Sequence, residues 1–386
     1  MESRETGLCG RLKLKKYVRS YAMILALASI WIIFQAVTQG TFLSIRNISN
    51  LFRQMSVVGV LAIGMTVCLI AGNFDLSVGS VTGFLGAVAA WSITGLSQSP
   101  MAAVLLAVVI GCLIGCWNGF WIAYAGVPAF IATLGSSLIF KGGLYIVTQG
   151  TTIPVRDPFF LTLGQKYLPP ALGYLLAGGT LIAFVFFDVR HQSSLSRVLG
   201  EQVSYFKRFG RYAGYLLVGA AFVVVMNSYE GIPIAVFVLL GLSGALTFVL
   251  AKTRFGRKVY AVGGNPRAAR MSGINNAAVC MTTFIIMGGL AGMAGVLQTA
   301  RLAAATPGAA MGMELDAVAS SVIGGVSLAG GSGKVINSVI GALVMASLTN
   351  GMSLLNVNSD VQYIVKGLIL IVAVWFDVRM RRAQNG

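Results

Sequence analysis

The chain has 386 residues, of which 56% are hydrophobic and only 10% are charged. A soluble domain carries about 25% charged residues, so this composition excludes a protein whose whole surface faces water. The net charge of +17 raises nucleic acid as a partner, but the basic residues lie in short segments between apolar runs rather than on one soluble module. We therefore expect membrane lipid, and no nucleic acid, beside these charges.

Apolar runs that can cross a hydrocarbon core of about 30 Å follow one another along the chain. They predict an all-α integral membrane protein, a polytopic helical bundle of about 10–12 spans, some of them broken or re-entrant. A basic segment at 1–20 precedes one transmembrane domain at 21–377, and a basic tail at 378–386 follows it. The first run is expected to be retained, because no small-residue cleavage site follows it. The predicted spans are residues 21–37, 55–72, 76–96, 101–124, 128–148, 170–187, 212–227, 232–251, 277–299, 313–330, 335–355 and 361–376.

The basic residues also predict the orientation of the bundle. With both termini in the cytoplasm, 21 of the 28 Lys and Arg residues fall on the cytoplasmic side and five on the outer side. Cytoplasmic loops of membrane proteins carry such an excess of positive charge. The sequence therefore predicts two cytoplasmic termini and a cytoplasmic loop at 252–276.

Interrupted helices are predicted at matching places in two weakly related halves of the chain. Residues 72–80 align with 324–332 at four of nine positions, and in both an apolar run enters a Gly/Ser-rich break. Non-helical backbone at membrane depth lines a cavity or is buried in protein, so breaks near the midplane indicate a translocation path. The polar residues beside the breaks are the candidates for this path: Asn73, Asp75, Ser77, Ser80, Ser327 and Ser332.

Asp75 is the boldest of these candidates, because a carboxylate at membrane depth is costly and usually functional. It also precedes a helix predicted to begin at Leu76, where its oxygens would accept hydrogen bonds from free amide groups. Capping is the favoured role for Asp75, and contact with the cargo is the alternative.

No catalytic cluster is recognisable in the sequence. His191 lies beside Arg190 in a basic loop without partners for a triad or a metal site, and the 11 acidic residues are scattered. The run at 330–334 resembles a phosphate-binding loop only superficially, because Leu328 and Val335 stand where Gly and Ser or Thr are needed. We expect a transport subunit and not an enzyme, with no metal site and no cofactor bound by this chain.

The loop at 252–276 is the most informative stretch. Asn265 followed by Pro266 predicts the start of a short helix over 266–271, and Ser272 with Gly273 predicts its end. A short cytoplasmic helix between two spans can act as a lever for a partner protein. A basic loop that only sets the topology is the alternative.

Motifs in this loop and elsewhere resemble those of one family. The runs at 254–257, 260–265 and 268–274 resemble the signature loop of permease subunits of bacterial monosaccharide ABC importers, the family of the ribose, arabinose, galactose and xylose systems. The runs at 74–80, 314–319, 322–331 and 350–351 resemble its other hallmarks, in order along the chain. Lys334 stands where the hallmark glycine-rich run ends, which puts the local packing there in doubt.

The resemblance implies an inner-membrane permease that pairs with a second copy as a homodimer. Two cytoplasmic ATP-binding domains would hydrolyse ATP, and a periplasmic sugar-binding protein would deliver the sugar. The loop at 252–276 would then supply the coupling helix for the ATPase. The residues implied in this coupling are Arg257, Gly264, Asn265, Arg267, Ala268, Arg270, Ser272 and Gly273.

The resemblance also bears on the cargo. Residues 170–230 add two spans that shorter ribose-type relatives lack, and this long form resembles D-xylose permeases most. Trp117 and Asn118 offer the aromatic and amide surface that suits sugars, although interfacial anchoring is the commoner use of Trp. Glu314 and Asp316, near the outer end of a predicted span, are expected to cap its N-terminus or to meet the binding protein. An ion-coupled secondary sugar transporter or facilitator that works without an ATPase is the alternative function.

Overall fold

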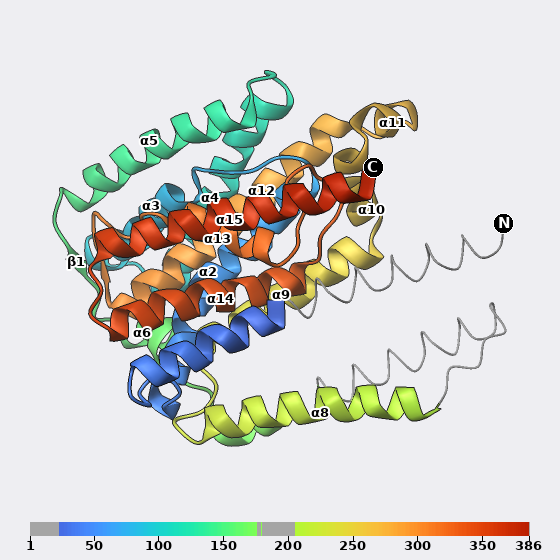
Figure 1. Ribbon diagram of the computed structural model, residues 1–386. Coiled ribbons are helices and arrows are strands. Elements are labelled where there is room, and N and C mark those ends of the chain that lie inside the picture. Colours follow the sequence, from blue (N-terminus) through green and yellow to red (C-terminus); the bar gives the residue numbers. More distant parts are fainter. Residues whose placement is uncertain (1–22, 176–178, 180–204, 386) are drawn as a thin grey trace.

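The computed structural model describes residues 23–175, 179 and 205–385. The predicted segment at 1–20, His191 and most of the predicted span at 170–187 lie outside these residues. The described chain is a bundle of helices with one very small sheet (Figure 1), which confirms the predicted all-α class. After a helix at Met23–Val37, the elements are α2 (Ile45–Ile70), α3 (Val78–Thr94), α4 (Pro100–Ala123), α5 (Ala129–Thr148), β1 (Ile153–Pro154), α6 (Pro158–Gln165), α8 (Tyr205–Asn227), α9 (Ile234–Lys252), α10 (Arg254–Gly264), α11 (Pro266–Met271), α12 (Asn276–Leu302), β2 (Ala304–Ala305), α13 (Met313–Ile323), α14 (Val335–Leu354) and α15 (Ser359–Asn385).

Seven of the described helices are long and apolar enough to cross a membrane, namely α2, α4, α5, α9, α12, α14 and the first part of α15. The helix at Met23–Val37 and α3 are shorter apolar helices. The chain is therefore a multi-pass membrane protein.

One predicted span is wrong: in place of a span over 313–330 the structure has α13, an 11-residue helix that ends at Ile323. Gly325 has φ +85°, a left-handed backbone conformation that stops the helix.

Helix α2 is the central element of the bundle. Within its apolar stretch 89% of the residues are buried, whereas none is buried in the apolar stretch of α15. Hydroxyl groups tie α2 to its neighbours: the Thr66 hydroxyl lies 2.6 Å from that of Ser338 on α14 and donates to that of Ser321 on α13 at 3.3 Å. Such bonds hold helices together where lipid provides no hydrophobic drive for their association.

Helices α4 and α12 pack with their backbones almost in contact. A Cβ atom added at Gly288 would collide with the carbonyl oxygen of Gly111, and one added at Gly115 would collide with that of Phe284. Small residues at such a crossing allow dispersion contacts along the whole helix pair. The glycines at this crossing thus serve helix packing.

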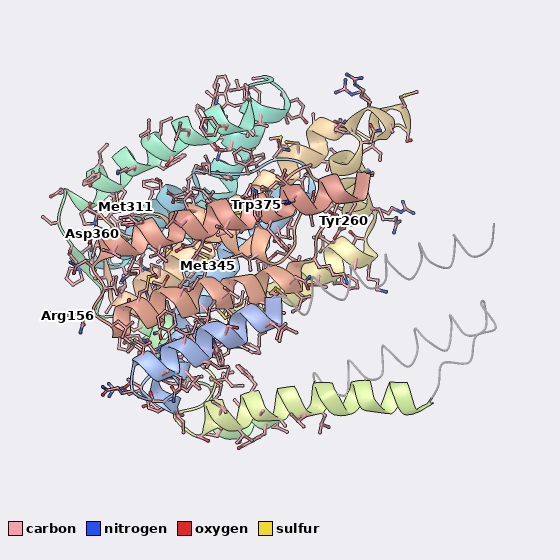
Figure 2. The ribbon with its side chains drawn as sticks, viewed as in Figure 1. Arg156, Tyr260, Met311, Met345, Asp360 and Trp375 are labelled. Atoms are coloured by element: carbon pink, nitrogen blue, oxygen red, sulfur yellow. The ribbon has the colours of Figure 1, made fainter. Side chains whose placement is uncertain are left out.

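The two ends of the bundle carry different structures. At one end β1 pairs antiparallel with β2, which joins the segment after α5 to the segment after α12; we call it the ribbon end. At the opposite end lie α10 and α11 (Figure 1), and we call it the α11 end. Figure 2 shows Arg156 at the ribbon end and Tyr260 at the α11 end. On the predicted orientation, the α11 end faces the cytoplasm.

Gly288→Ala is expected to lower the stability of the protein by about 1–3 kcal/mol, because the added methyl group meets backbone atoms that cannot move aside. Gly135→Ala is the matched control, since a Cβ atom there has no neighbour within 4 Å. That control should be neutral or stabilising by up to about 1 kcal/mol through helix propensity. Thermal unfolding of the purified variants in detergent measures both, and equal melting temperatures would contradict the packing argument.

Candidate functional site

The first break lies between α2 and α3. The Asp75 carboxylate accepts hydrogen bonds from the backbone N–H of Ser77 at 2.8 Å and from the Ser77 hydroxyl at 2.5 Å. Helix α3 begins at Val78 with Ser77 as its N-cap, two residues later than the sequence predicted. Asp75 therefore satisfies a backbone amide at the start of this helix, while its role toward a cargo stays a prediction.

A buried polar chain continues from this break into the bundle. The Asn118 amide on α4 donates to the Ser77 hydroxyl at 2.9 Å, and the Ser136 hydroxyl on α5 donates to the Asn118 oxygen at 2.6 Å. Asp75, Ser77, Asn118 and Ser136 are all buried. We call these four residues the polar chain. It brings together three residues that the sequence proposed for the path.

Ser136 was missed by the sequence reasoning. It belongs to a Ser136-Ser137 pair inside an otherwise apolar run, and this pair was the available signal. The Ser137 hydroxyl lies 2.9 Å from that of Ser80, another predicted path residue. Helix α5 thus contributes one hydroxyl to the polar chain through Asn118 and another to α3 directly.

The second break, at residues 324–334, lies against the end of α2. The backbone N–H of Gly331 donates to the carbonyl oxygen of Ile70 at 2.9 Å. Within the break, the N–H of Ser327 donates to the carbonyl oxygen of Ser332 at 2.9 Å. Ser327 is buried and Ser332 is exposed. The two breaks that the sequence aligned with each other therefore meet in space.

Helix α13 begins deep in the bundle. The Glu314 carboxylate lies directly against Gly79, where a Cβ atom would collide with it. On α3, Gly79 lies two turns from Gly86. Gly86 contacts Gly295 on α12, and Gly295 lies two turns from the end of α12 at the ribbon end. Glu314 is thus roughly 20 Å from that end of a helix about 40 Å long. The structure places Glu314 near half depth, whereas the sequence predicted the outer end of a span.

Asp316 forms an ion pair inside the bundle. Its Oδ2 atom lies 2.8 Å from the ammonium group of Lys366 on α15, and the two side chains are 8% and 15% exposed. Its Oδ1 atom is buried without a hydrogen-bond partner among the described residues. Asp316 therefore joins α13 to α15, and the predicted contact with a binding protein stays a prediction.

Trp117 and Asn73, like Ser80, Ser327 and Ser332, are predicted path residues that lie outside the polar chain. Trp117 is 45% exposed on the surface of α4, where its ring lies 5.5 Å from that of Trp121 in an edge-on arrangement. Exposed aromatic side chains near the end of a span are typical of interfacial anchoring. The Asn73 amide donates to the Cys280 sulfur at 3.4 Å, on the side of the break that faces α12.

The short helix predicted in the loop is confirmed at its predicted bounds. Helix α11 covers Pro266–Met271, and the Asn265 side chain accepts from the N–H groups of Arg267 at 3.1 Å and Ala268 at 3.0 Å. Gly273, just beyond its end, has φ +78°. Arg267, Ala268 and Arg270 are exposed.

Two features of the α11 end had not been predicted. The first is Met271, which is 90% exposed at the end of α11. The second is α10, whose Gly263 is so close to the end of α2 that a Cβ atom would collide with the Ile70 carbonyl oxygen and lie 2.8 Å from the Gly331 nitrogen. Gly263 thus sits where both breaks meet.

Tyr260 adds a side-chain bond at the same junction. Its hydroxyl donates to the carbonyl oxygen of Gly333 at 2.8 Å. Burial raises the pKa of the Tyr260 phenol, so the group stays protonated and remains a donor. Gly330 and Gly331, with φ +87° and +71°, approach the backbone of α10 without room for side chains. Helix α10 is therefore fixed to the second break at several points.

Comparisons with known proteins show the family of the chain. The model of a family described as branched-chain amino acid transport system / permease component matches residues 47–374. This match covers most of the sequence, and the chain belongs to that family of transport permeases.

Curated relatives resemble the chain over nearly its whole length. It is 43% identical over 362 residues to the xylose transport system permease protein XylH of Haemophilus influenzae, covering 94% of this chain and 96% of the relative. XylH of Escherichia coli is 41% identical, covering 94% and 92%. The ribose import permease protein RbsC of Escherichia coli is 33% identical, covering 87% of each chain. No solved structure matches the chain.

Asp75→Ala is expected to lower stability by about 1–3 kcal/mol, because the buried N–H and hydroxyl of Ser77 lose their acceptor. Asp75→Asn is the matched variant, since its amide oxygen can still accept both bonds. Thermal unfolding and transport are measured for each. A stable Asp75→Asn protein that still transports assigns Asp75 to capping, whereas a stable protein without transport would contradict a purely capping role.

Lys366→Met is expected to destabilise the bundle by about 3–5 kcal/mol, because it leaves the buried Asp316 carboxylate without its cation. Adding Asp316→Asn removes the uncompensated charge and should restore most of the loss. A double-mutant cycle of thermal unfolding gives the coupling energy. Additive effects of the two changes would show that the ion pair does not join α13 to α15.

Proposed function

We propose that this chain is the membrane-spanning permease subunit of an ATP-driven importer that moves a monosaccharide, first of all D-xylose, across the bacterial inner membrane. The names of its relatives support the cargo, since XylH is a xylose transport permease and RbsC a ribose import permease. XylH relatives are also matched over more of this chain than RbsC of Escherichia coli, at 94% against 87%.

The proposal includes the partners that a permease of this kind needs. Two cytoplasmic ATPase domains bind at the α11 end, and a periplasmic sugar-binding protein delivers its sugar at the ribbon end. A second copy of the chain completes the permease as a homodimer. Both termini lie in the cytoplasm, and ATP is bound and hydrolysed by the partner rather than by this chain.

The observation that carries the proposal is the construction of α11. Its exposed side chains, Arg267, Arg270 and Met271, present charge and an apolar group to a partner. Its base is joined to α10, and α10 contacts the end of α2 and the second break through Gly263 and Tyr260. A displacement of α11 is therefore transmitted to both breaks through backbone contacts, which have no flexible side chains between them.

The translocation path is proposed to run beside the polar chain and Glu314. These groups lie in the interior of the bundle and offer hydroxyl, amide and carboxylate groups, which pair well with sugar hydroxyls. Glu314 lies near half depth, and the second protomer would close the path from the other side. The sequence predicted that Glu314 and Asp316 contact the binding protein. At this depth, the contact requires that part of the binding protein reaches into the bundle from the ribbon end.

Uptake of labelled sugars tests the function directly. A cell in which this chain is the only permease, with its cognate ATPase and binding protein co-expressed, should accumulate xylose in an ATP-dependent manner. Ribose, arabinose and galactose in the same assay define the selectivity. Xylose flux into liposomes that contain the purified chain alone, driven by an ion gradient, would overturn the ATP-driven proposal.

Gly273→Pro, or Arg267→Glu together with Arg270→Glu, is expected to reduce uptake more than tenfold while membrane insertion persists. Proline cannot adopt φ +78° and lacks the N–H that Gly273 donates to the Arg270 carbonyl oxygen at 3.0 Å. Charge reversal that places like charges opposite each other at a docking surface costs several kcal/mol of binding. Arg156→Glu, at the ribbon end, is the control and should leave ATPase binding unchanged; normal uptake by the loop variants would contradict the coupling role.

A further inference from the structure

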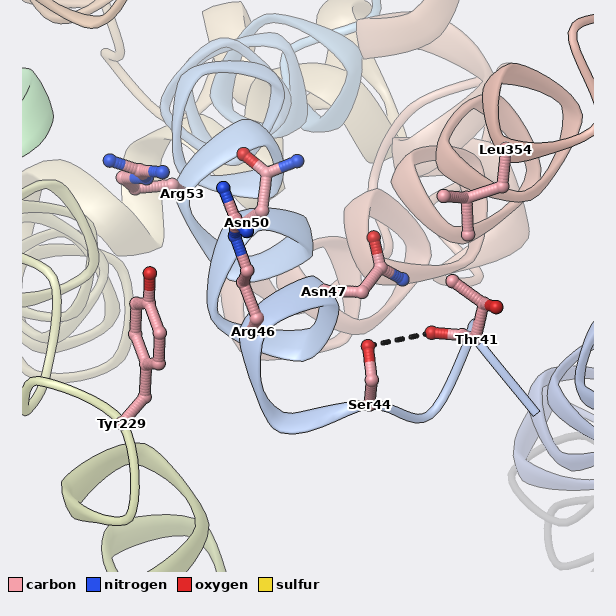
Figure 3. A pocket seen from close by; sticks show the side chains of 8 residues that line it. All are labelled: Thr41, Ser44, Arg46, Asn47, Asn50, Arg53, Tyr229 and Leu354. Atoms are coloured by element: carbon pink, nitrogen blue, oxygen red, sulfur yellow. Dashed lines mark hydrogen bonds between the residues drawn. The ribbon is translucent and has the colours of Figure 1, made fainter.

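A pocket of about 410 Å³ opens at the ribbon end, beside the first turns of α2 (Figure 3). It lies between α2, the turn that follows α8 and the last turn of α14. Most of its lining side chains are polar. The lining residues are Thr41, Ser44, Arg46, Asn47, Asn50, Arg53, Tyr229 and Leu354.

The side chains that line the pocket carry positive charge, and no negative side chain among them balances it. Arg46, Asn50 and Arg53 lie one and two turns apart on a single face of α2, and all three line the pocket (Figure 3). None of the eight lining residues is acidic. Glu230 follows Tyr229 in the chain, but it does not line the pocket and forms no salt bridge within the described part of the chain. The pocket is therefore suited to an anion.

Arg53 is held in place by neutral groups. Its Nη1 atom donates to the carbonyl oxygen of Gln165 at 3.3 Å, and its guanidinium carbon lies 5.5 Å from the centre of the Tyr167 ring. Its Nε atom is buried without a hydrogen-bond partner among the described residues. These contacts orient the guanidinium and leave its charge uncompensated, which is the state that an anion would relieve.

The position of the pocket relative to the hydrocarbon core indicates which layer of the membrane surrounds it. Helix α9 has 19 residues and is about 28 Å long, close to the thickness of a hydrocarbon core, so its start at Ile234 marks the edge of that core. Gly59 of α2 contacts Leu239 of α9, which places Arg53 level with that start. The first two turns of α2 therefore extend about 12 Å further, through the layer of lipid headgroups.

We propose that this pocket binds the phosphate group of a phospholipid from the leaflet at the ribbon end. Arg46 and Arg53 hold the phosphate oxygens, with Asn50 as a further donor. Tyr167 and Tyr229, whose rings lie 5.8 Å apart, flank the site at the depth where interfacial aromatic residues gather. Leu354 supplies an apolar wall for the glycerol region.

The site has a structural consequence, because its walls come from separate parts of the chain. Val223 and Met226 of α8 pack in a small buried cluster with Ile232 and with Val236 of α9. A lipid bound between Tyr229 and the arginines of α2 adds a second contact at the end of α8. The lipid thus joins the end of α8 to α2, the central helix of the permease.

The test is lipid binding to the purified full-length protein by native mass spectrometry. Phosphatidylglycerol and phosphatidylethanolamine are titrated separately, beside diacylglycerol with the same acyl chains and inorganic phosphate. Arg46→Ala should weaken binding of one phospholipid at least fivefold, since Arg46 is exposed and its loss leaves the fold intact. Arg46→Lys should retain part of the affinity, and Arg156→Ala, an equal loss of charge at the same end, should retain all of it.

Several outcomes would overturn the proposal. Equal phospholipid binding by the wild type and Arg46→Ala would do so, as would diacylglycerol that binds with the same dependence on Arg46. Arg46-dependent binding of inorganic phosphate as tight as that of phospholipid would assign the pocket to a soluble anion. If Arg46→Glu lowered only the binding protein's stimulation of ATP hydrolysis in the assembled complex, with lipid binding unchanged, the pocket would belong to an acidic protein surface instead.

Discussion

The bundle depends on the need to pair backbone polar groups that are buried away from water, because an unpaired one is costly. Both breaks leave backbone groups without partners in their own helices. These groups are paired because the two breaks lie side by side in the bundle. The N–H of Gly331 finds its acceptor at Ile70, and the start of α3 finds one in Asp75. A break in one half of the chain therefore needs the other half, which fixes α2 as the central helix between them.

The same requirement joins α10 closely to both breaks at the α11 end, which supports the proposed coupling role. Gly263 lies against Ile70 and Gly331 with no side chain between the backbones, and Tyr260 adds a bond to Gly333. Helices held by backbone contacts move as one body, since no flexible side chain absorbs the displacement. The ribbon end is built differently. There polar side chains surround an open pocket, which is the basis for the proposed binding of a lipid phosphate.

Much of the fold could be read from the sequence because its signals are local. The bounds of α11 follow from Asn265, Pro266 and Gly273, each of which acts on its own turn of backbone. The apolar runs locate most spans for the same reason. The end of α13 at Ile323 was missed, because the run stays apolar through Val326 and only the left-handed conformation of Gly325 stops the helix. Ser136 was missed because its partner, Asn118, lies on another helix.

The sequence by itself determined that the chain spans a membrane many times, where its two breaks fall, and the short capped helix α11, since composition and neighbouring residues suffice for each. Only the tertiary structure decided that Glu314 lies near half depth against Gly79, that Asp316 pairs with Lys366, and that Arg46 and Arg53 share a pocket with Tyr229. These contacts join residues that are far apart in the chain. Their geometry depends on how helices cross, and no local pattern of residues encodes it.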